Sequence, residues 1–137
     1  MSRRTARLNA YQLVFEYLFT RELDKKAYDT MIGAEDITDA DVEYIKNVIS
    51  GVNEHYDDLI ELISQNSKNF RLDRIYKPDL AALLLATYEM KYVDDIPLAV
   101  SISEVIDIVK TFSTENSNKF VNGVLKGVYN TLSKKEV

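Results

Sequence analysis

Apolar residues recur every three or four positions through most of this chain, which is the spacing of one face of an α-helix. This spacing predicts a first helix over residues 3–20, and its apolar positions are Leu8, Tyr11, Phe15 and Leu18. A short helix over residues 27–32 is expected to end at Gly33, because glycine is favoured just after a helix. No stretch alternates apolar and polar residues as a strand would, so the chain is predicted to be all-α.

The clearest pattern follows Thr38, a residue suited to cap a helix N-terminus. Seven apolar positions after it alternate spacings of three and four: Val42, Ile45, Ile49, Val52, Tyr56, Leu59 and Ile63. This seam predicts one helix of about six turns that spans the molecule as part of a helical bundle. His55, the only histidine, falls inside it without a second metal ligand nearby, so we interpret it as part of a helix–helix contact.

The second half of the chain predicts three more helices. Pro78 suits the first turn of a helix to about Tyr92, whose segment 80–86 is apolar on every side and should be the most buried. Pro97 opens the next helix, with the stripe Leu98, Ile102, Val105, Ile106, Val109 and Phe112. The last helix has the stripe Val121, Val124, Leu125, Val128 and Leu132.

About six to seven helices are therefore expected, as two small helical bundles packed together. We expect a single domain over residues 1–137, with an N-terminal helical subdomain over about 1–66 and a C-terminal one over about 78–137. The polar connection between residues 66 and 77 is the predicted boundary.

Composition argues against several classes of protein. The chain has no cysteine, which excludes disulfides and cysteine-bound metal and fits a cytoplasmic location. No run of about 18 apolar residues is present, so no membrane span is expected. Adjacent acidic pairs such as Asp57–Asp58 diverge on a helix, and the four glycines form no phosphate-binding loop. We expect no enzymatic activity, no cofactor and no metal.

Charge is distributed unevenly along this chain of net charge -5. Residues 1–26 carry six basic and three acidic side chains, whereas the remainder carries eleven basic and nineteen acidic ones. Arg3, Arg4 and Arg7 fall on one side of the first helical turns, where cations repel one another and the helix dipole. This cost is explained if the arginines bind phosphates, and the alternative is a solvated, frayed terminus.

A second signal lies in the last helix. Phe120 is placed about 100° away from the apolar stripe, next to Lys119 and near the flank of Gly123 and Gly127. Aromatic rings beside basic side chains often stack on the bases of single-stranded nucleic acid. The alternative is that Phe120 packs at the edge of the core.

Six segments occur in one order along the chain: "RRTAR", "GVNEHYDDLIELI", "LDRI", "ATYEM", "DIPLAVSISEVIDIVKTF" and "SNKFVNGVL". Together they resemble the bacterial NusB transcription antitermination factors over essentially the whole chain. The resemblance implies an all-α fold of two small helical bundles and a non-catalytic protein. It also implies a heterodimer with NusE, a protein of the small ribosomal subunit. That heterodimer binds boxA RNA of ribosomal RNA transcripts and joins the antitermination complex on RNA polymerase.

The same resemblance assigns residues to two surfaces. The RNA contacts that it implies are Arg3, Arg4, Arg7, Lys119 and Phe120, and the implied NusE contacts are Phe15, Phe19 and Asp79. Three positions depart from the family pattern: Phe70 stands where Trp is frequent, Ser103 where Asn is frequent, and Leu84 where Arg is frequent.

Two other readings stay open at this point. One is a targeting module of an RNA methyltransferase, although 137 residues leave no room for a cofactor-binding domain. The other is an interaction module without RNA, because some family members form homodimers that hide the arginine face.

Overall fold

Helix α5 (Lys77–Tyr92) is the centre around which the other helices pack. It contacts α1, α3, α4, α6 and α7, and every residue from Asp79 to Met90 is buried. The prediction that this apolar helix is the most buried one is confirmed. The structure is a computed structural model that describes residues 2–67 and 71–135, with side chains as far as Ser133.

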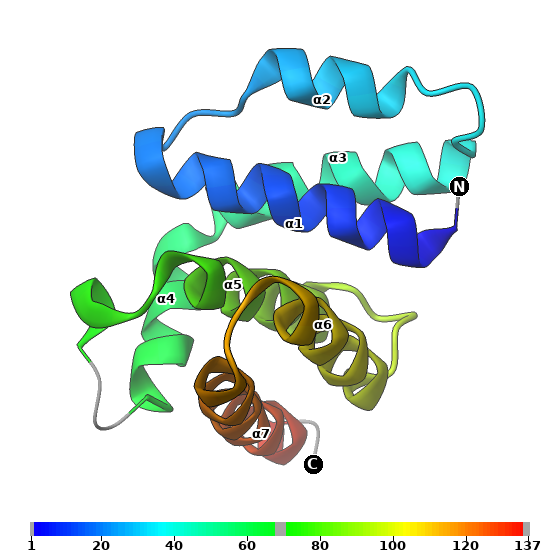
Figure 1. The fold of residues 1–137 in the computed structure, drawn as a ribbon. Coiled ribbons are helices and arrows are strands. Elements are labelled where there is room, and N and C mark those ends of the chain that lie inside the picture. Colours follow the sequence, from blue (N-terminus) through cyan, green and yellow to red (C-terminus); the bar gives the residue numbers. More distant parts are fainter. Residues whose placement is uncertain (1, 68–70, 136–137) are drawn as a thin grey trace.

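Within these described residues the chain forms seven α-helices and no strand, so the all-α prediction is confirmed. The remaining elements are α1 (Arg3–Thr20), α2 (Lys25–Ile32), α3 (Asp39–Glu54), α4 (Tyr56–Gln65), a short 3-10 turn η1 (Leu72–Arg74), α6 (Leu98–Phe112) and α7 (Glu115–Lys135). Helices α1, α2 and α3 lie on one side of α5, and α6 and α7 lie on the other (Figure 1).

The local start signals act as the sequence suggests. The Thr38 hydroxyl accepts a hydrogen bond from the Asp41 amide at 3.1 Å, so Thr38 caps α3 as predicted. Ser2 caps α1 by accepting from the Thr5 amide at 3.1 Å. These caps fix where α1 and α3 begin, and both beginnings carry residues of the candidate site.

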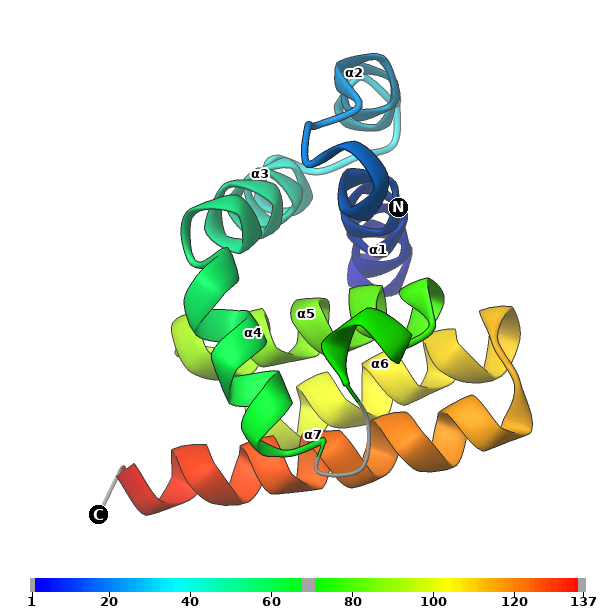
Figure 2. The same ribbon diagram turned by 90° about the vertical axis from the view of Figure 1, so that its left-hand side faces the viewer.

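The prediction of one long helix through residues 42–63 is wrong, because the chain breaks at His55. This residue has φ -106° and ψ 17°, and it ends α3 and begins α4. Its ring stacks on Tyr92 of α5, with centroids 4.0 Å apart and planes 15° from parallel. Helix α4 then turns away from the direction of α3 and packs against α5 and α7 (Figure 2). The expected helix-contact role of His55 is confirmed.

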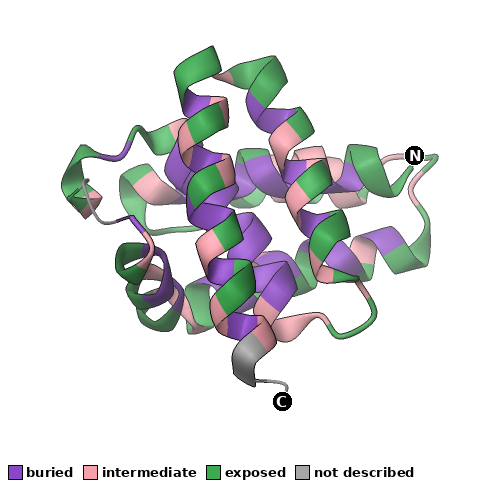
Figure 3. Cartoon of the chain, turned by 90° about the horizontal axis from the view of Figure 1, so that it is seen from below, coloured by how far each residue is buried: buried purple, intermediate pink, exposed green. Residues whose placement is uncertain are grey.

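The buried faces agree with the predicted stripes to different degrees. All five predicted positions of α7 are buried. In α1 the buried face instead centres on Ala6, Ala10, Leu13, Val14 and Tyr17, and the predicted Leu8, Phe15 and Leu18 are only half-buried. Phe112, predicted in the α6 stripe, is 48% exposed. Buried positions lie where the helices face one another, as Figure 3 shows from the side of α7.

The division into subdomains near residues 66–78 stays a prediction. Helix α4 precedes that boundary in sequence but packs against α5 and α7, which follow it. The two groups of helices therefore share the core that surrounds α5.

Two helical glycines provide a matched test of this packing. A Cβ at Gly51 would overlap the ring of Tyr88, whereas a Cβ at Gly123 would meet no atom within 4 Å. Gly51→Ala should lower the free energy of unfolding by about 1–3 kcal/mol through overpacking. Gly123→Ala should raise it by about 0.5–1 kcal/mol, because alanine favours the helix. Urea unfolding followed by circular dichroism measures both, and equal effects of the two variants would contradict the close approach of α3 to α5.

Candidate nucleic-acid interface

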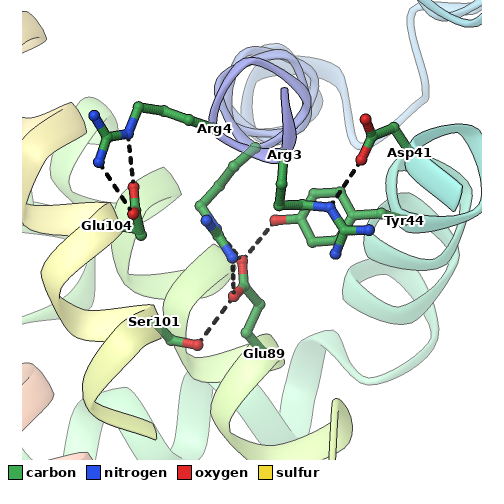
Figure 4. A network of polar contacts seen from close by, with 8 residues as sticks. Arg3, Arg4, Asp41, Tyr44, Glu89, Ser101 and Glu104 are labelled. Atoms are coloured by element: carbon green, nitrogen blue, oxygen red, sulfur yellow. Dashed lines mark hydrogen bonds and ion pairs between the residues drawn. The ribbon is translucent and has the colours of Figure 1, made fainter. Parts of the chain in front are cut away.

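The first turns of α1 point their three arginines at three different helices. Consecutive helical residues are rotated by about 100°, so Arg3 and Arg4 leave α1 in different directions. Figure 4 shows Arg3 turned toward α3 and Arg4 turned toward α6. Arg7 lies one turn further along and points into the protein, where it meets α5.

Arg7 forms a buried ion pair with Glu89 of α5. Its Nε and Nη2 atoms donate to Oε2 and Oε1 of Glu89 at 2.8 and 3.0 Å. Only 4% of Arg7 and none of Glu89 is exposed. Burial opposes the charge of Arg7, but the hydrogen bonds and negative charge of Glu89 outweigh it and raise the pKa of the guanidinium.

Two hydroxyl groups complete the surroundings of the Glu89 carboxylate. Tyr44 of α3 donates to Oε2 at 2.6 Å, and Ser101 of α6 donates to Oε1 at 3.0 Å (Figure 4). Burial and the charge of Glu89 raise the pKa of Tyr44, so its hydroxyl keeps the proton that it donates. One carboxylate therefore joins α1, α3, α5 and α6.

The expectation that all three arginines crowd one exposed side is wrong for Arg7. Its guanidinium is committed to a carboxylate in the core and is not presented to solvent. The fully buried carboxylate of Glu89 is stabilised by an opposite charge, which α1 supplies. The exposed part of the arginine group is therefore Arg3 and Arg4 alone.

Arg3 is held against α3. Its Nε donates to Oδ1 of Asp41 at 2.9 Å, and its guanidinium carbon lies 4.6 Å from the centre of the Tyr44 ring. The side chain is 41% exposed, whereas the Asp41 side chain is nearly buried. Arg3 therefore combines a fixed direction with an accessible guanidinium.

Arg4 is held against α6 and is more open. Its Nε and Nη2 donate to the two oxygens of Glu104 at 3.1 and 3.2 Å, and 72% of its side chain is exposed. The hydrogen bond from Arg4 lowers the pKa of Glu104. Arg4, Thr5 and Leu8 also line a groove of about 540 Å³ between α1 and α6.

The structure does not bring Lys119 and Phe120 next to these arginines. Both residues lie on α7, and α5 and α6 lie between α7 and α1 in the two views of Figures 1 and 2. Lys119 is exposed, but Phe120 is half-buried and packs against the edge of the core. The flank beside it is open only at Gly123, because Gly127 faces the side chain of Asn66.

The residues predicted for the partner surface differ in how far they are exposed. Phe19 is 61% exposed and meets Phe15 edge to face, with ring centroids 5.1 Å apart. Asp79, however, is buried and accepts a hydrogen bond from Ser113 at 2.9 Å. Its NusE contact stays a prediction, and in this structure the carboxylate holds the turn between α6 and α7.

Phe112 completes this surface and was missed by the sequence reasoning. It lies 6.2 Å from the Tyr11 ring and lines a groove of about 430 Å³ with Phe15 and Pro78. Its position as the last residue of α6, next to a polar turn, was the available signal. Burial and the negative charge of Asp79 raise the pKa of Tyr11 to about 12, so Tyr11 stays neutral in this groove.

The departures from the family pattern fall in different surroundings. Leu84 is fully buried in α5, where an arginine would need a partner. Ser103 is exposed and lines a groove between α6 and α7. Phe70 lies outside the described residues.

Among the described residues, no group of three or more His, Asp or Glu side chains is arranged to hold a metal ion. None of the helices described combines the length and apolar character needed to cross a membrane.

Known proteins match most of the chain. Residues 4–130 match the family model described as the NusB family. Transcription antitermination protein NusB of Finegoldia magna is 37% identical over 128 residues, which cover 93% of each chain. The corresponding protein of Bacillus cereus is 39% identical over 133 residues, which cover 96% of this chain and 100% of the relative.

Solved structures share the fold. T. maritima NusB has a TM-score of 0.84 and 34% identity, with 95% of this chain and 92% of that chain covered. A structure of antitermination factors NusB and NusE in complex with double-stranded RNA contains a chain with a TM-score of 0.80 and 23% identity, with 94% and 96% covered. At that identity the second likeness concerns the fold alone.

The buried ion pair predicts a large difference between neighbouring arginines. Arg7→Ala should lower the free energy of unfolding by about 3–5 kcal/mol, because Glu89 would stay buried without its counter-charge. Arg4→Ala should leave it nearly unchanged, since Arg4 is exposed. Urea unfolding compares the two, and the double variant Arg7→Met, Glu89→Met should lose less than the sum of its single changes. An Arg7→Ala protein as stable as the Arg4→Ala protein would contradict the network.

Proposed function

Because the chain belongs to the NusB family of transcription antitermination proteins, we propose that it binds RNA and acts in transcription antitermination. The family consists of non-catalytic factors, and the chain is accordingly not an enzyme. The observation that carries the RNA proposal is the pair of exposed arginines, Arg3 and Arg4, on the first turn of α1 in an otherwise acidic protein.

The proposed ligand is the boxA RNA of ribosomal RNA transcripts. Guanidinium groups on a rigid helix suit phosphate oxygens, which they contact through two parallel hydrogen bonds. The acidic remainder of the chain repels polyanions, so affinity is concentrated at the arginines. The solved complex of NusB and NusE with double-stranded RNA supports an RNA ligand for this fold.

Lys119 and Phe120 form the second proposed RNA contact. Lys119 supplies an exposed charge, and the half-buried ring of Phe120 supplies an apolar surface on which a base can stack. Because α5 and α6 separate this contact from the arginines, one RNA strand reaches both only by passing across the surface of the protein.

The proposed protein partner is NusE, at the aromatic surface of Phe15, Phe19 and Phe112. Phe19 is 61% exposed and Phe112 is 48% exposed. Exposed clusters of aromatic side chains mark interaction surfaces. In this proposal the heterodimer carries boxA RNA into the antitermination complex on RNA polymerase, in the bacterial cytoplasm. Arg7 and Asp79 serve this function indirectly, by holding α1 and the α6–α7 turn in place.

A homodimer through the same aromatic surface is the second candidate. It is favoured by the exposure of Phe19 and Phe112, which both lie beside Phe15. Sedimentation of the protein with and without NusE distinguishes the two partners, because a homodimer on this surface would dissociate when NusE binds.

The arginine contact predicts a change in salt dependence. Arg3→Ala and Arg4→Ala should each weaken binding of single-stranded boxA RNA. Each lost phosphate contact should reduce the slope of log affinity against log salt by about 0.7. Fluorescence anisotropy titrations over a range of salt concentrations measure this slope, and Lys46→Ala on the exposed face of α3 is the control. A double Arg3→Ala, Arg4→Ala variant with the slope of the unsubstituted protein would exclude both arginines from the RNA site.

Phe120 and Phe19 are expected to affect different ligands, RNA in one case and NusE in the other. Phe120→Ala should reduce RNA affinity by about 1–3 kcal/mol and leave NusE binding intact, whereas Phe120→Tyr should retain most of the RNA affinity. Phe19→Ala should weaken NusE binding and leave RNA binding by the free protein intact. Calorimetry with NusE and anisotropy with RNA measure the two affinities. A Phe120→Ala protein that melts much earlier but binds RNA normally in the cold would assign Phe120 to the core.

A further inference from the structure

The two exposed arginines of α1 are engaged by their carboxylates in different ways. Arg3 uses only Nε, which donates to Asp41 at 2.9 Å. Arg4 uses the edge formed by Nε and Nη2, which donates to both oxygens of Glu104 at 3.1 and 3.2 Å. The difference decides which nitrogens of each guanidinium are left for a ligand.

Arg3 keeps both terminal nitrogens available. Within the described residues, Nη1 and Nη2 of Arg3 donate to no other side chain. The guanidinium lies over the ring of Tyr44, and Asp41 is itself nearly buried in the first turn of α3. The side chain is thus fixed at one nitrogen and one face, while 41% of it stays exposed to solvent. Such an arrangement lowers the conformational entropy that binding would otherwise cost.

Arg4 has its paired edge already occupied. Two parallel hydrogen bonds from Nε and Nη2 are also the geometry in which a guanidinium binds a phosphate. A phosphate that takes this edge must therefore replace the Glu104 carboxylate. The ion pair is open to solvent, since most of Arg4 and part of Glu104 are exposed, so the exchange is sterically accessible.

We propose that Asp41 and Glu104 set the RNA affinity of this protein in opposite directions. Asp41 is a positioning residue that orients Arg3 toward phosphate, and Glu104 is an intramolecular competitor that RNA displaces from Arg4. The inference rests on the proposed RNA contacts of Arg3 and Arg4, and it adds the two carboxylates that control those contacts.

This pairing limits binding of unrelated polyanions. A phosphate that contacts Arg4 alone replaces the Glu104 carboxylate with a similar anionic contact, so little free energy is gained. The terminal nitrogens of Arg3 can bind phosphate without displacing a carboxylate. An RNA that contacts Arg3 as well as Arg4 therefore gains the free energy of that additional contact. Glu104 therefore keeps the most exposed arginine from acting as a general anion site, in agreement with the acidic character of the rest of the chain.

The test is the sign of the change when each carboxylate is removed. Glu104→Gln should bind fluorescein-labelled single-stranded boxA RNA about two- to fivefold more tightly, since an exposed ion pair contributes an effect of that size. Asp41→Ala should bind it about two- to fivefold more weakly, although the variant has lost a negative charge. Asp41→Asn keeps an oxygen that accepts from Arg3 Nε, so its affinity should fall between those of the Ala variant and the unsubstituted protein.

Two controls make the result specific. Asp58→Asn removes the same charge from an exposed position on α4 and should change RNA affinity less than about twofold. The gain from Glu104→Gln should vanish in a protein that also carries Arg4→Ala. Circular dichroism and urea unfolding confirm that each variant is folded. If Asp41→Ala does not fold, Asp41→Asn shows whether loss of this carboxylate raises or lowers the RNA affinity.

The possible outcomes separate this inference from the proposed function. If the unsubstituted protein does not bind RNA, the proposed function fails and the inference fails with it. If it binds RNA but the Asp41 and Glu104 variants all tighten binding by the amount seen for Asp58→Asn, only net charge matters and the inference alone is overturned. Persistence of the Glu104→Gln gain in the absence of Arg4 would also overturn it.

Discussion

The arrangement of the helices depends on one fully buried carboxylate, that of Glu89. A charge in this position is stable only when its oxygens accept hydrogen bonds from neighbouring donors. Arg7, Tyr44 and Ser101 supply these donors, and each comes from a different helix. Apolar packing along α5 brings the helices together but does not fix the position of each helix along the axis of α5. Directional hydrogen bonds to one pair of oxygens fix the positions of α1, α3 and α6 relative to α5.

The exposed arginines take their placement from this network. Arg3 and Arg4 precede Arg7 on the same rigid helix, so the ion pair in the core sets the direction in which they leave α1. Three cations at the positive end of a helix dipole should repel one another. The structure relieves this repulsion because Asp41, Glu89 and Glu104 pair with one arginine each. Stability and an accessible basic surface are thus obtained from the same short segment.

Local patterns predicted most of the helices but few of the long-range contacts. The limits of α1 and α5, the Thr38 cap and the α7 stripe follow from interactions within about one helical turn, which the sequence displays directly. The break at His55 was missed because one non-helical residue leaves the apolar spacing intact, and both halves bury a face against α5. The burial of Arg7 was missed because its partner lies 82 residues away. One signal was available: Glu89 lies in the part of α5 that is buried throughout, where a carboxylate is stabilised by a cation nearby.

The span of the Arg7–Glu89 contact also has a consequence for synthesis on the ribosome. Helix α1 is made first, yet the carboxylate that it requires is made 82 residues later. At about 5–20 residues per second, the first helix waits roughly 4–16 s before its partner exists. During this interval the Arg7 guanidinium lacks its counter-charge, and the face of α1 that packs on α5 has no native surface to cover it. Because α5 also supplies the centre for α3, α4, α6 and α7, the nascent chain gains its cooperative core only when α5 emerges from the exit tunnel.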